Sequence, residues 1–396
     1  MNRKAWGLAA IVLGTLVAAQ GADHPGQHFF IDPAHLPKPF ATPAADNGGD
    51  MVARPPGVLP QVPKGFTIAP YVTGLSNPRF MALAPNGDVF LAESYADKIT
   101  LLHKGVAYTF ASGFHYPHGL AFHDGALYVA DLDAVWRVAY RGGALTAGAR
   151  TRVTKDSFGG RGEHITRDIA FGPDGTLYLA IGSYNHLAEE APPRASVQIV
   201  TPGGHLRTFA RGMRNPVGIA FYPGTNRLYV TVDERDGYGD NLPPDYFTGL
   251  GKNDFLGWPY AYDGPNPDPQ FGAKRRDLVA RTKTPDVLFQ AHSAPLGLVF
   301  YNGSQFPAPY RGDAFVALHG SWNTSMPTGY KIVRIHFKNG RPQKGYENFV
   351  TGFWMSGTHP PRVWGRPAGL LVAKDGSLLI ADDQGKTVWR VRYTGK

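Results

Sequence analysis

Residues 119–131 read GLAFHDGALYVAD, two short apolar runs that flank the dipeptide Asp124-Gly125. Asp-Gly gives the backbone the positive φ that a tight hairpin turn requires, so this stretch predicts two antiparallel strands. The same design recurs in IAFGPDGTLYLAIG at residues 169–182 and in LLVAKDGSLLIAD at residues 370–382. Hairpins of one kind therefore return at widely separated places in the chain.

A longer phrase contains these hairpins and occurs six times. It reads Pro-x-Gly-hydrophobic, an apolar run, a turn, and a second apolar run that closes in a small or acidic residue. The copies occupy residues 78–93, 117–131, 164–183, 216–234, 295–320 and 367–383; the first has Phe80 in place of the Gly, and the third lacks the Pro and Gly. A recurring strand-rich unit of about 40–50 residues is typical of a β-propeller. The sequence therefore predicts an all-β fold, a six-bladed β-propeller with four-stranded antiparallel blades. A large sandwich or jelly roll is the alternative that the regular spacing disfavours.

The chain divides into three parts. Residues 1–22 combine a basic start, an apolar stretch and small residues, which predicts a secretory signal peptide and a periplasmic or secreted protein. An uncleaved membrane anchor is the alternative, but the apolar stretch is short for that role. Residues 23–62, rich in Pro, Ala, Gly and Asp, are expected to form an extended arm, and residues 63–396 a single propeller domain. The long interval between Pro216 and Pro295 predicts an excursion from its blade.

Composition excludes several kinds of chemistry. The chain has no cysteine, so disulfides, iron–sulfur ligation and covalent c-type haem attachment are ruled out. The formal net charge of +9 is spread along the chain without a dense Lys/Arg block. We therefore expect no nucleic-acid partner and no membrane insertion after signal cleavage.

Basic and polar residues stand just ahead of the apolar runs. They are His118, His164, Arg167, Arg214, Asn215, His292 and Arg366. Equivalent repeat positions of a propeller meet at one end of its central channel, so these residues are expected to form one cluster. Cations gathered at one mouth repel each other unless an anion lies among them. The sequence thus predicts an anionic ligand with several carboxylates, held by arginine forks.

The excursion carries the opposite charge. Its carboxylates are Asp233, Glu234, Asp236, Asp240 and Asp245, set among glycines and prolines. Oxygen donors on a Gly-rich loop suit a hard cation such as Ca²⁺. A solvated acidic loop is the alternative reading of the same composition.

Four longer stretches combine these features. They are GEHITRDIAFGPDGTLYLAIGS at residues 162–183, RGMRNPVGIAFYPGTNRLYVTVDERDGYGDNLPPDYFT at 211–248, AHSAPLGLVFYNGSQFPAPYRGDAFVALHGSWN at 291–323 and WGRPAGLLVAKDGSLLIADD at 364–383. In these stretches the chain resembles the soluble PQQ-dependent sugar dehydrogenases, above all the sorbosone dehydrogenase-like type. The resemblance covers residues 63–394 and rests on Arg-Asn-Pro, Glu-Arg-Asp-Gly and His-Ser-Ala-Pro-Leu-Gly together.

The resemblance implies roles for individual residues. His164 lies where the family has its general base, which takes the proton of the sugar hydroxyl. Arg214 and Asn215 match the pair that contacts the quinone edge, with Arg214 steadying charge on the quinone oxygen. Arg366 matches an arginine that binds a cofactor carboxylate. The other expected cofactor-binding residues are Arg235, His292, Arg167 and His118.

The resemblance also implies a Ca²⁺ site and a reaction. Backbone carbonyls at Asp236 and Gly237 align with the loop that holds the ion against PQQ, where it acts as a Lewis acid. Glu234 and Asp240 complete the expected metal set. We therefore expect a periplasmic quinoprotein dehydrogenase that oxidises a sugar or a related alcohol or aldehyde by hydride transfer to PQQ. An external quinone, cytochrome c or dye would accept the electrons.

The chain departs from this pattern in two places. Residues 320–323, Gly-Ser-Trp-Asn, replace a lysine of the glucose-oxidising members, so one cofactor carboxylate would need another partner. Residues 184–186, Tyr-Asn-His, stand where many relatives carry cysteines. The long substrate loops of the glucose-oxidising members are absent as well, so glucose is not the expected substrate.

Alternatives remain open for single residues and for the whole chain. His118 and His292 either line the site or brace its loops, and Arg167 either binds the cofactor or pairs with Asp168 or Glu163. The tryptophans are expected to pack in the interior, as for Trp258, Trp322, Trp354 and Trp364. A Ca²⁺-dependent lactonase or esterase, or a propeller that only binds a ligand, are the alternative functions.

Overall fold

The computed structural model describes residues 23–396, so the expected signal peptide lies outside the described residues. This part of the chain is nearly all strand. Its helices are α1 Arg276–Ala280 and the 3₁₀ turns η1 Ser94–Ala96, η2 Gly272–Arg275 and η3 Ala308–Tyr310. Within the described range no helix is long and apolar enough to cross a membrane.

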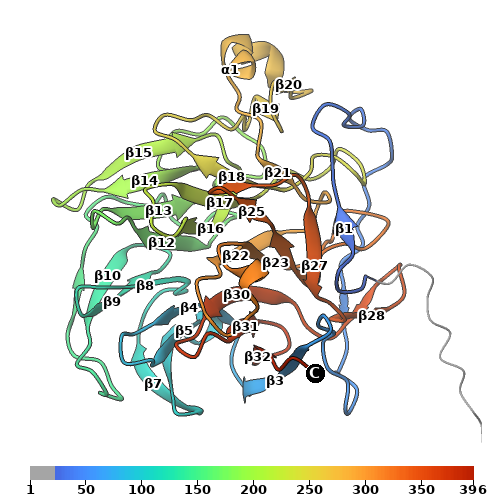
Figure 1. Cartoon of the computed structure of the whole chain (residues 1–396). Coiled ribbons are helices and arrows are strands. Elements are labelled where there is room, and N and C mark those ends of the chain that lie inside the picture. Colours follow the sequence, from blue (N-terminus) through green and yellow to red (C-terminus); the bar gives the residue numbers. More distant parts are fainter. Residues whose placement is uncertain (1–22) are drawn as a thin grey trace, which may run out of the picture.

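Six sheets of four or five strands follow one another around a common centre (Figure 1). Blade 1 contains β4 Pro78–Leu83, β5 Val89–Glu93, β6 Lys98–His103 and β7 Val106–Ser112. Blade 2 contains β8 Gly119–His123, β9 Ala126–Ala130, β10 Val135–Ala139 and β11 Arg150–Arg152. Blade 3 contains β12 Arg167–Phe171, β13 Leu177–Ile181, β14 Ser196–Val200 and β15 Leu206–Arg211.

The remaining blades are built the same way, with two additions from the N-terminal part of the chain. Blade 4 contains β16 Asn215–Phe221, β17 Leu228–Asp233, β18 Tyr246–Leu250 and β21 Val287–Leu288. Blade 5 contains β22 Pro295–Phe300, β23 Ala314–Leu318, β24 Lys331–Ile335, β27 Tyr346–Val350 and, at its edge, β1 His28–Phe29. Blade 6 contains β30 Pro367–Val372, β31 Leu378–Asp382, β32 Thr387–Tyr393 and β3 Phe66–Thr73. The predicted six-bladed propeller is confirmed.

The ring is closed by strands from opposite ends of the chain. β3 pairs antiparallel with β32, from Phe66 opposite Tyr393 to Thr73 opposite Thr387. Each innermost strand also contacts the next, and β30 of the last blade contacts β4 of the first. The last blade is therefore complete only when both ends of the propeller meet.

The glycine of the Pro-x-Gly phrase marks the contact between neighbouring innermost strands. A Cβ added to Gly369 on β30 would lie 2.1 Å from the carbonyl oxygen of Arg79 on β4. Cβ atoms at Gly119, Gly218 and Gly297 would likewise lie 2.3–2.6 Å from backbone of the adjoining innermost strand. The repeat thus records a close approach of backbones around the channel, which no residue with a side chain permits.

Apolar side chains fill the space between blades. One cluster joins Ala130 and Val135 of blade 2 to Ile169 and Leu177 of blade 3. Similar clusters lie at the other blade contacts. Each blade therefore buries its faces against its neighbours, as a propeller requires.

The interval expected to form an excursion departs from the blade twice: in the acidic loop, residues 234–245, between β17 and β18, and in a longer segment between β18 and β21. The longer segment contains the hairpin β19 Ala261–Tyr262 with β20 Asn266–Pro267, followed by η2 and α1. In Figure 1 this segment projects from the rim of blade 4. Another small hairpin, β25 Phe337–Lys338 with β26 Arg341–Pro342, extends blade 5.

Residues 23–62 lie along the propeller at several points. β1 pairs with β27, β2 Asp50–Met51 pairs in parallel with β29 Arg362–Val363, and Gln61 bridges to Thr351. β28 Trp354–Ser356 completes the sheet that β2 joins. The arm is thus fastened to blade 5 and to the connection between blades 5 and 6 before the chain enters β3.

We expect Gly369→Ala to lower the free energy of unfolding by about 1–3 kcal/mol, because the added methyl group would overlap the Arg79 carbonyl. Chemical denaturation of the purified protein measures this difference. Gly142→Ala is the matched control, since a Cβ there meets no atom within 4 Å. Equal stability of the two variants would contradict the close approach inferred for the innermost strands.

Candidate functional site

A cavity of about 240 Å³ opens at the channel end where the innermost strands of blades 1, 3, 4, 5 and 6 begin. It is lined by Arg79, Glu163, His164, Ile165, Thr166, Asn215, Asp233, Asp236, His292, Ala294, Leu296, His319, Gly320, Trp322 and Arg366. Four of the residues expected at one mouth, namely His164, Asn215, His292 and Arg366, do come together here. Their convergence follows from the fold, because each lies at or just before an innermost strand.

The floor of the cavity is formed by side chains that plug the channel. Phe80, Val217, Leu296 and Ala368, from four different innermost strands, pack in one apolar cluster. His118 contacts the ring of Phe80 at 4.3 Å between centroids and is fully buried. The channel is therefore closed beneath the cavity rather than open through the molecule.

His118 braces this floor and does not line the cavity. Its Nδ1 lies 3.3 Å from the carbonyl oxygen of Arg167, and its Nε2 lies 3.4 Å from a guanidinium nitrogen of Arg79. Burial, and then the Arg79 charge, lowers the pKa of His118 well below its ordinary value. Of the two roles left open for this residue, the geometry fits the bracing role.

His164 is held by hydrogen bonds at one ring nitrogen only. Nδ1 lies 3.0 Å from the Ser183 carbonyl oxygen and 2.9 Å from Ser183 Oγ. A carbonyl can only accept, and Ser183 Oγ donates to the carbonyl of Asn185 at 2.6 Å, so Nδ1 carries the proton. Nε2 therefore has a lone pair, and His164 lines the cavity. This is the form of histidine that can accept a proton from a bound molecule.

Burial keeps His164 neutral. Loss of solvent is the first cause that lowers the pKa of His164 well below 6.5, and the positive charge of Arg214 is the second. The hydrogen bond to Ser183 acts in the opposite direction but is weaker. The ring is therefore unprotonated at neutral pH and ready to act as a base.

Arg214 binds the loop that follows β17 and does not line the cavity. Its guanidinium lies 3.3 Å from the Asp233 carboxylate and 3.2 Å from the Asp236 carboxylate. It also donates to the carbonyl oxygen of Glu234 at 2.8 Å and to Nδ1 of His186 at 2.9 Å. Arg214, expected at the quinone edge, instead holds acidic residues beside His164.

Asn215 leaves one polar atom free at the cavity. Its side-chain nitrogen donates to Asp233 at 3.2 Å, while its Oδ1 is buried and has no hydrogen-bond partner among the described residues. Burial raises the pKa of Asp233, against the opposing charge of Arg214. An orphaned amide oxygen on a cavity wall marks a place where a ligand can supply a donor.

His292 links two parts of the acidic loop. Its Nδ1 lies 3.0 Å from the Asp236 carboxylate, and its Nε2 donates to the carbonyl oxygen of Gly239 at 3.0 Å. Burial alone would raise the pKa of Asp236, but the His292 hydrogen bond and the Arg214 charge outweigh it and lower that pKa. His292 thus both lines the cavity and braces the loop.

A second set of charges lies across the cavity. Asp383 accepts from Arg79 and lies 3.0 Å from Nε2 of His319. Burial would raise the pKa of Asp383, but His319 and Arg79 together hold it far below the usual range. Burial and the charge of Arg366 lower the pKa of His319 to about 4. Part of the cationic mouth is therefore balanced by a carboxylate of the chain itself.

Arg366 is the cavity cation that has no carboxylate partner in the described chain. Its Nε donates to the His319 carbonyl oxygen at 3.1 Å and its Nη2 to the Gly320 carbonyl oxygen at 2.7 Å. The guanidinium lies over the ring of Tyr330 at 5.6 Å, and burial lowers its pKa. A positive charge held only by neutral groups is suited to an anionic ligand.

Two of the expected cofactor-binding arginines point elsewhere. Arg167 donates to the carbonyl oxygens of His164 at 2.9 Å and Thr166 at 2.7 Å, so it shapes the loop that carries the base. It does not pair with Asp168 or Glu163; burial, and then the nearby Arg194, lowers its pKa to about 9. Arg167 is thus placed as a structural residue, because both of its terminal guanidinium nitrogens donate to backbone carbonyls.

Arg235 is fully buried away from the cavity. Its guanidinium lies 2.9 Å from the Glu234 carboxylate and 2.6 Å from Asp268, and it donates to the Ala261 carbonyl oxygen at 2.6 Å. These contacts raise its pKa against the effect of burial. Arg235 therefore ties the acidic loop to the segment between β18 and β21, and it does not line the cavity.

The residues expected to bind Ca²⁺ do not converge through their side chains. Asp236 is engaged by His292 and Arg214, and both oxygens of Asp240 accept from Ser325, at 2.7 and 2.6 Å. The described residues contain no group of three or more His, Cys, Asp or Glu suited to a metal ion. A cation at this loop would have to rely on backbone carbonyls at 236–237.

Several cavity residues were not among the expected site residues. Arg79, His319 and Trp322 line the cavity, together with Asp233, which was expected only as part of the acidic excursion. Arg79 directly follows Pro78 in the first copy of the repeated phrase, and His319 lies at the end of the fifth copy. The repeat could therefore have indicated both of these residues.

Trp322 corrects the expectation that the tryptophans pack in the interior. Trp258 and Trp364 are each only 2% exposed, as expected, whereas Trp322 is 49% exposed at the cavity rim. An exposed aromatic ring beside a polar cavity offers a flat apolar surface to a ligand. No repeat or spacing in the sequence distinguishes this tryptophan from the others.

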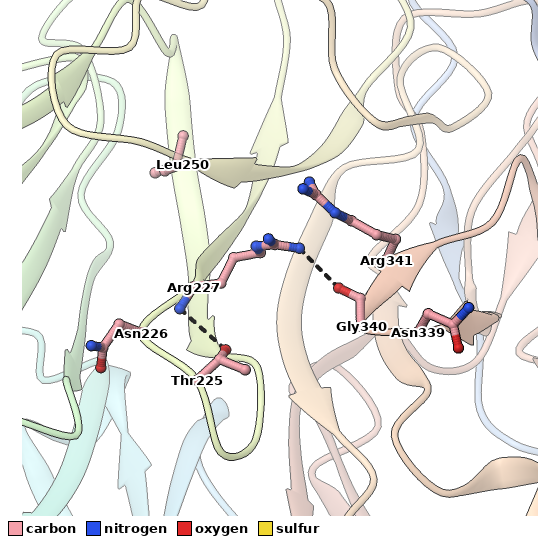
Figure 2. A pocket seen from close by; sticks show the side chains of 7 residues that line it. All are labelled: Thr225, Asn226, Arg227, Leu250, Asn339, Gly340 and Arg341. Atoms are coloured by element: carbon pink, nitrogen blue, oxygen red, sulfur yellow. Dashed lines mark hydrogen bonds between the residues drawn. The ribbon is translucent and has the colours of Figure 1, made fainter.

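A larger pocket of about 460 Å³ lies at the opposite end of blade 4 (Figure 2). It is lined by Thr225, Asn226, Arg227, Leu250, Asn339, Gly340 and Arg341. Arg227 donates to the Gly340 carbonyl oxygen at 2.9 Å across it. The lining contains no histidine or carboxylate, so it lacks the proton-accepting groups that the smaller cavity gathers.

Comparison with known proteins matches the sequence of this chain to two family models. A model described as glucose/sorbosone dehydrogenase matches residues 132–326, and a model described as TrAA12-like matches residues 270–394. Together these matches include the elements that carry His164, His292 and Arg366. Residues 132–326 of the chain therefore resemble the glucose/sorbosone dehydrogenase family.

Relatives in sequence differ in how much of their length is matched. An uncharacterised protein of Borreliella burgdorferi is 28% identical over 84% of this chain and 90% of its own length. The aldose sugar dehydrogenase YliI of Escherichia coli is 27% identical over 37% of this chain, and a PQQ-dependent pyranose dehydrogenase of Coprinopsis cinerea is 26% identical over 69%. The chain spans less than half the length of these two dehydrogenases, 43% and 44%.

Solved structures of sugar dehydrogenases share the fold of this chain. The PQQ domain of the Coprinopsis cinerea pyranose dehydrogenase superposes with a TM-score of 0.71 at 21% identity, over 86% of this chain and 98% of that domain. The apo aldose sugar dehydrogenase of Escherichia coli gives a TM-score of 0.63 at 16% identity, over 83% and 99%. The dehydrogenase family fold thus extends over most of the described chain.

We expect Arg214→Gln to raise the pKa of His164, because the arginine charge is the second largest cause that lowers it. Loss of the arginine also frees the Asp236 charge, which acts in the same direction. NMR titration of the His164 ring in protein without added ligand measures the change. Arg392→Gln, at an exposed ion pair with Asp375, is the control. An unchanged His164 titration in Arg214→Gln would refute this account of the site.

Proposed function

We propose that this chain is a PQQ- and Ca²⁺-dependent dehydrogenase that oxidises a sugar, or a related alcohol or aldehyde, in the cavity beside His164. The observation that carries the proposal is the neutral His164, with its lone pair at Nε2, on the wall of a cavity that also presents Arg366. A base next to an unpaired cation suits an alcohol substrate beside an anionic oxidant. The names of the relatives support the same reaction class.

The cavity residues fit a cofactor that carries several carboxylates. Arg366 has no carboxylate partner in the described chain, and Asn215 Oδ1 and Arg79 Nε are buried polar atoms without a hydrogen-bond partner. These groups would hold PQQ by charge and hydrogen bonds. When bound, PQQ supplies the hydride acceptor that the side chains of this protein lack. Arg214 would act through its charge and through the acidic loop that it holds.

The acidic loop would hold Ca²⁺ mainly through the backbone carbonyls of residues 236–237, because no group of three side-chain ligands converges among the described residues. Glu234 Oε1 is buried without a hydrogen bond in this loop, although the same carboxylate pairs with Arg235. Oxygen donors of this kind suit a hard cation. At the cavity such an ion would supply Lewis-acid chemistry.

The protein's own part in the reaction is proton transfer at one atom. His164 Nε2 takes the hydroxyl proton of the substrate, while Nδ1–H stays bound to the Ser183 carbonyl and fixes the ring. The resulting positive charge is opposed by the nearby Arg214, so the proton is easily passed on to solvent.

Trp322 at the cavity rim supports a sugar as the substrate. Trp322 offers a flat apolar face of the kind that packs against a sugar ring. An external quinone, cytochrome c or dye would receive the electrons, and a cleaved signal at 1–22 would place the enzyme in the periplasm or outside the cell. The hydrolase alternative is tested by adding a lactone and Ca²⁺, without PQQ, to the same protein. Hydrolysis of the lactone under these conditions would favour that alternative.

Addition of PQQ and Ca²⁺ to the purified apoprotein should change the absorption spectrum and allow dye reduction with aldoses or sugar aldehydes. His164→Gln should keep the bound-cofactor spectrum and lose turnover by roughly 10²–10⁴-fold, because it removes the base. His205→Gln, at an exposed histidine bound to Asp156, is the control and should retain activity. No spectral change at micromolar PQQ would overturn the proposal, and full activity of His164→Gln would remove that residue from the mechanism.

The loaded enzyme should keep its activity well below pH 6.5. Catalysis needs neutral His164, and a lowered pKa means that this form persists until the pH falls through that lowered value. The acid limb of kcat/KM, measured across a pH series, reports the pKa of the base in the free enzyme. An acid limb at or above pH 6.5 would show that a group other than His164 controls the reaction.

A further inference from the structure

The N-terminal arm touches two loops at the rim of the cavity. One is residues 236–240, which follows β17, and the other is residues 320–325, which follows β23 and carries Trp322. Residues 40–47 of the arm contact both loops through hydrogen bonds. We call this meeting of arm and loops the rim junction.

The arm packs closely on the first loop. The Phe40 amide donates to the Tyr238 carbonyl oxygen at 2.8 Å, and the Asp240 amide donates to Thr42 Oγ1 at 2.7 Å. Gly239 has a φ of 110°, and a Cβ there would lie 2.9 Å from the Thr42 carbonyl oxygen. The loop thus has a shape and a glycine that accommodate the arm.

Asn47 fastens the arm to the second loop. Its backbone amide donates to the Trp322 carbonyl oxygen at 2.7 Å. Its side-chain nitrogen lies 3.0 Å from the Thr324 carbonyl oxygen, 3.3 Å from that of Ser325 and 2.8 Å from that of Thr358. Asn47 is buried although most of the arm around it is exposed. With its three N–H donors Asn47 therefore contacts four backbone carbonyls, three in the second loop and one at Thr358.

Asn323 joins all three segments. Its Oδ1 accepts from the Gly237 amide at 2.8 Å, and its Nδ2 donates to the Ala45 carbonyl oxygen at 2.5 Å. Asp240 adds a second tie between the loops, because its carboxylate accepts from the Ser325 amide. An asparagine side chain has the donor and the acceptor that this bridge needs, and neither aspartate nor leucine has both.

We propose that residues 40–47 of the arm belong to the functional site and position Trp322 and residues 236–237 at the cavity, with Asn47 and Asn323 as positioning residues. Trp322 is 49% exposed, so burial does not orient it, and the hydrogen bond to its own carbonyl does so instead. The side chain of Asn323 holds the Gly237 amide, next to the backbone carbonyls of residues 236–237 that were proposed for Ca²⁺. The consequence for catalysis rests on the proposed function; the positioning itself does not.

The rim junction is separate from what fastens the arm elsewhere. β1 pairs with β27, β2 pairs with β29, and Gln61 bridges to Thr351, all outside residues 40–47. Substitutions at the junction therefore loosen the two loops without releasing the arm from the propeller.

Hydrogen exchange of the apoprotein tests the positioning directly. In Asn47→Ala, amides of residues 322–325 and 237–240 should exchange about tenfold faster, since local opening sets their rate. Asn323→Asp keeps an acceptor for the Gly237 amide but loses the donor to Ala45, whereas Asn323→Leu loses both. Gly237 should therefore be deprotected in Asn323→Leu and less so in Asn323→Asp. Arg54→Ala, an exposed arm residue beyond the junction, should leave both loops unchanged.

Exchange rates like those of the wild type in Asn47→Ala and Asn323→Leu would overturn the proposal. In the loaded enzyme, both variants should raise KM or the Ca²⁺ concentration for half-activation by roughly tenfold, with kcat changed much less. Altered exchange with unaltered KM and Ca²⁺ dependence would overturn the role at the site. Altered exchange in a protein that never reduces dye with any sugar would support the positioning and count against the proposed function instead.

Discussion

Close contact between the backbones of neighbouring innermost strands is the constraint on which the rest of this structure depends. It requires glycine in four of the six copies of the repeat and leaves room in the channel only for the side chains that plug it. Because the plug fills the lower channel, polar residues just ahead of each innermost strand are left at one end, around a single cavity. The site is thus a product of the tight ring beneath it.

The arginines around that cavity are paired with carboxylates, with one exception. Arg214 and Arg79 are each matched by buried carboxylates, whereas Arg366 is held only by carbonyls and a ring. Burying matched charges costs far less than burying single ones, so the matched arginines can shape loops without a ligand. Burial, and then the charge of Arg214, lowers the pKa of His164, so an arginine that supports the loops also helps to keep the base neutral.

The sequence predicted most of the fold because its determinants are local. Hairpin turns and the Pro-x-Gly phrase can be recognised within a dozen residues, and they fix strand number and order. The site was predicted in part: position in the repeat brought His164 and His292 to the cavity, but it did not reveal the direction of a side chain. Arg235 turns into the excursion because its partner Asp268 lies there, a long-range contact that no spacing indicates. The exposure of Trp322 likewise depends on the placement of its loop, residues 320–325, which long-range contacts with the N-terminal arm hold.

Closure of the last blade by β3 and β32 bears on when the site can exist during synthesis. A chain made from its N-terminus produces β3 early, yet its pairing partner emerges last. Until then blade 6 is incomplete, and Arg366 on one side of the cavity has no fixed position relative to Arg79 on the other. Assembly of the cavity is therefore a final event of folding, and an incompletely synthesised chain has no binding site even when five blades have formed.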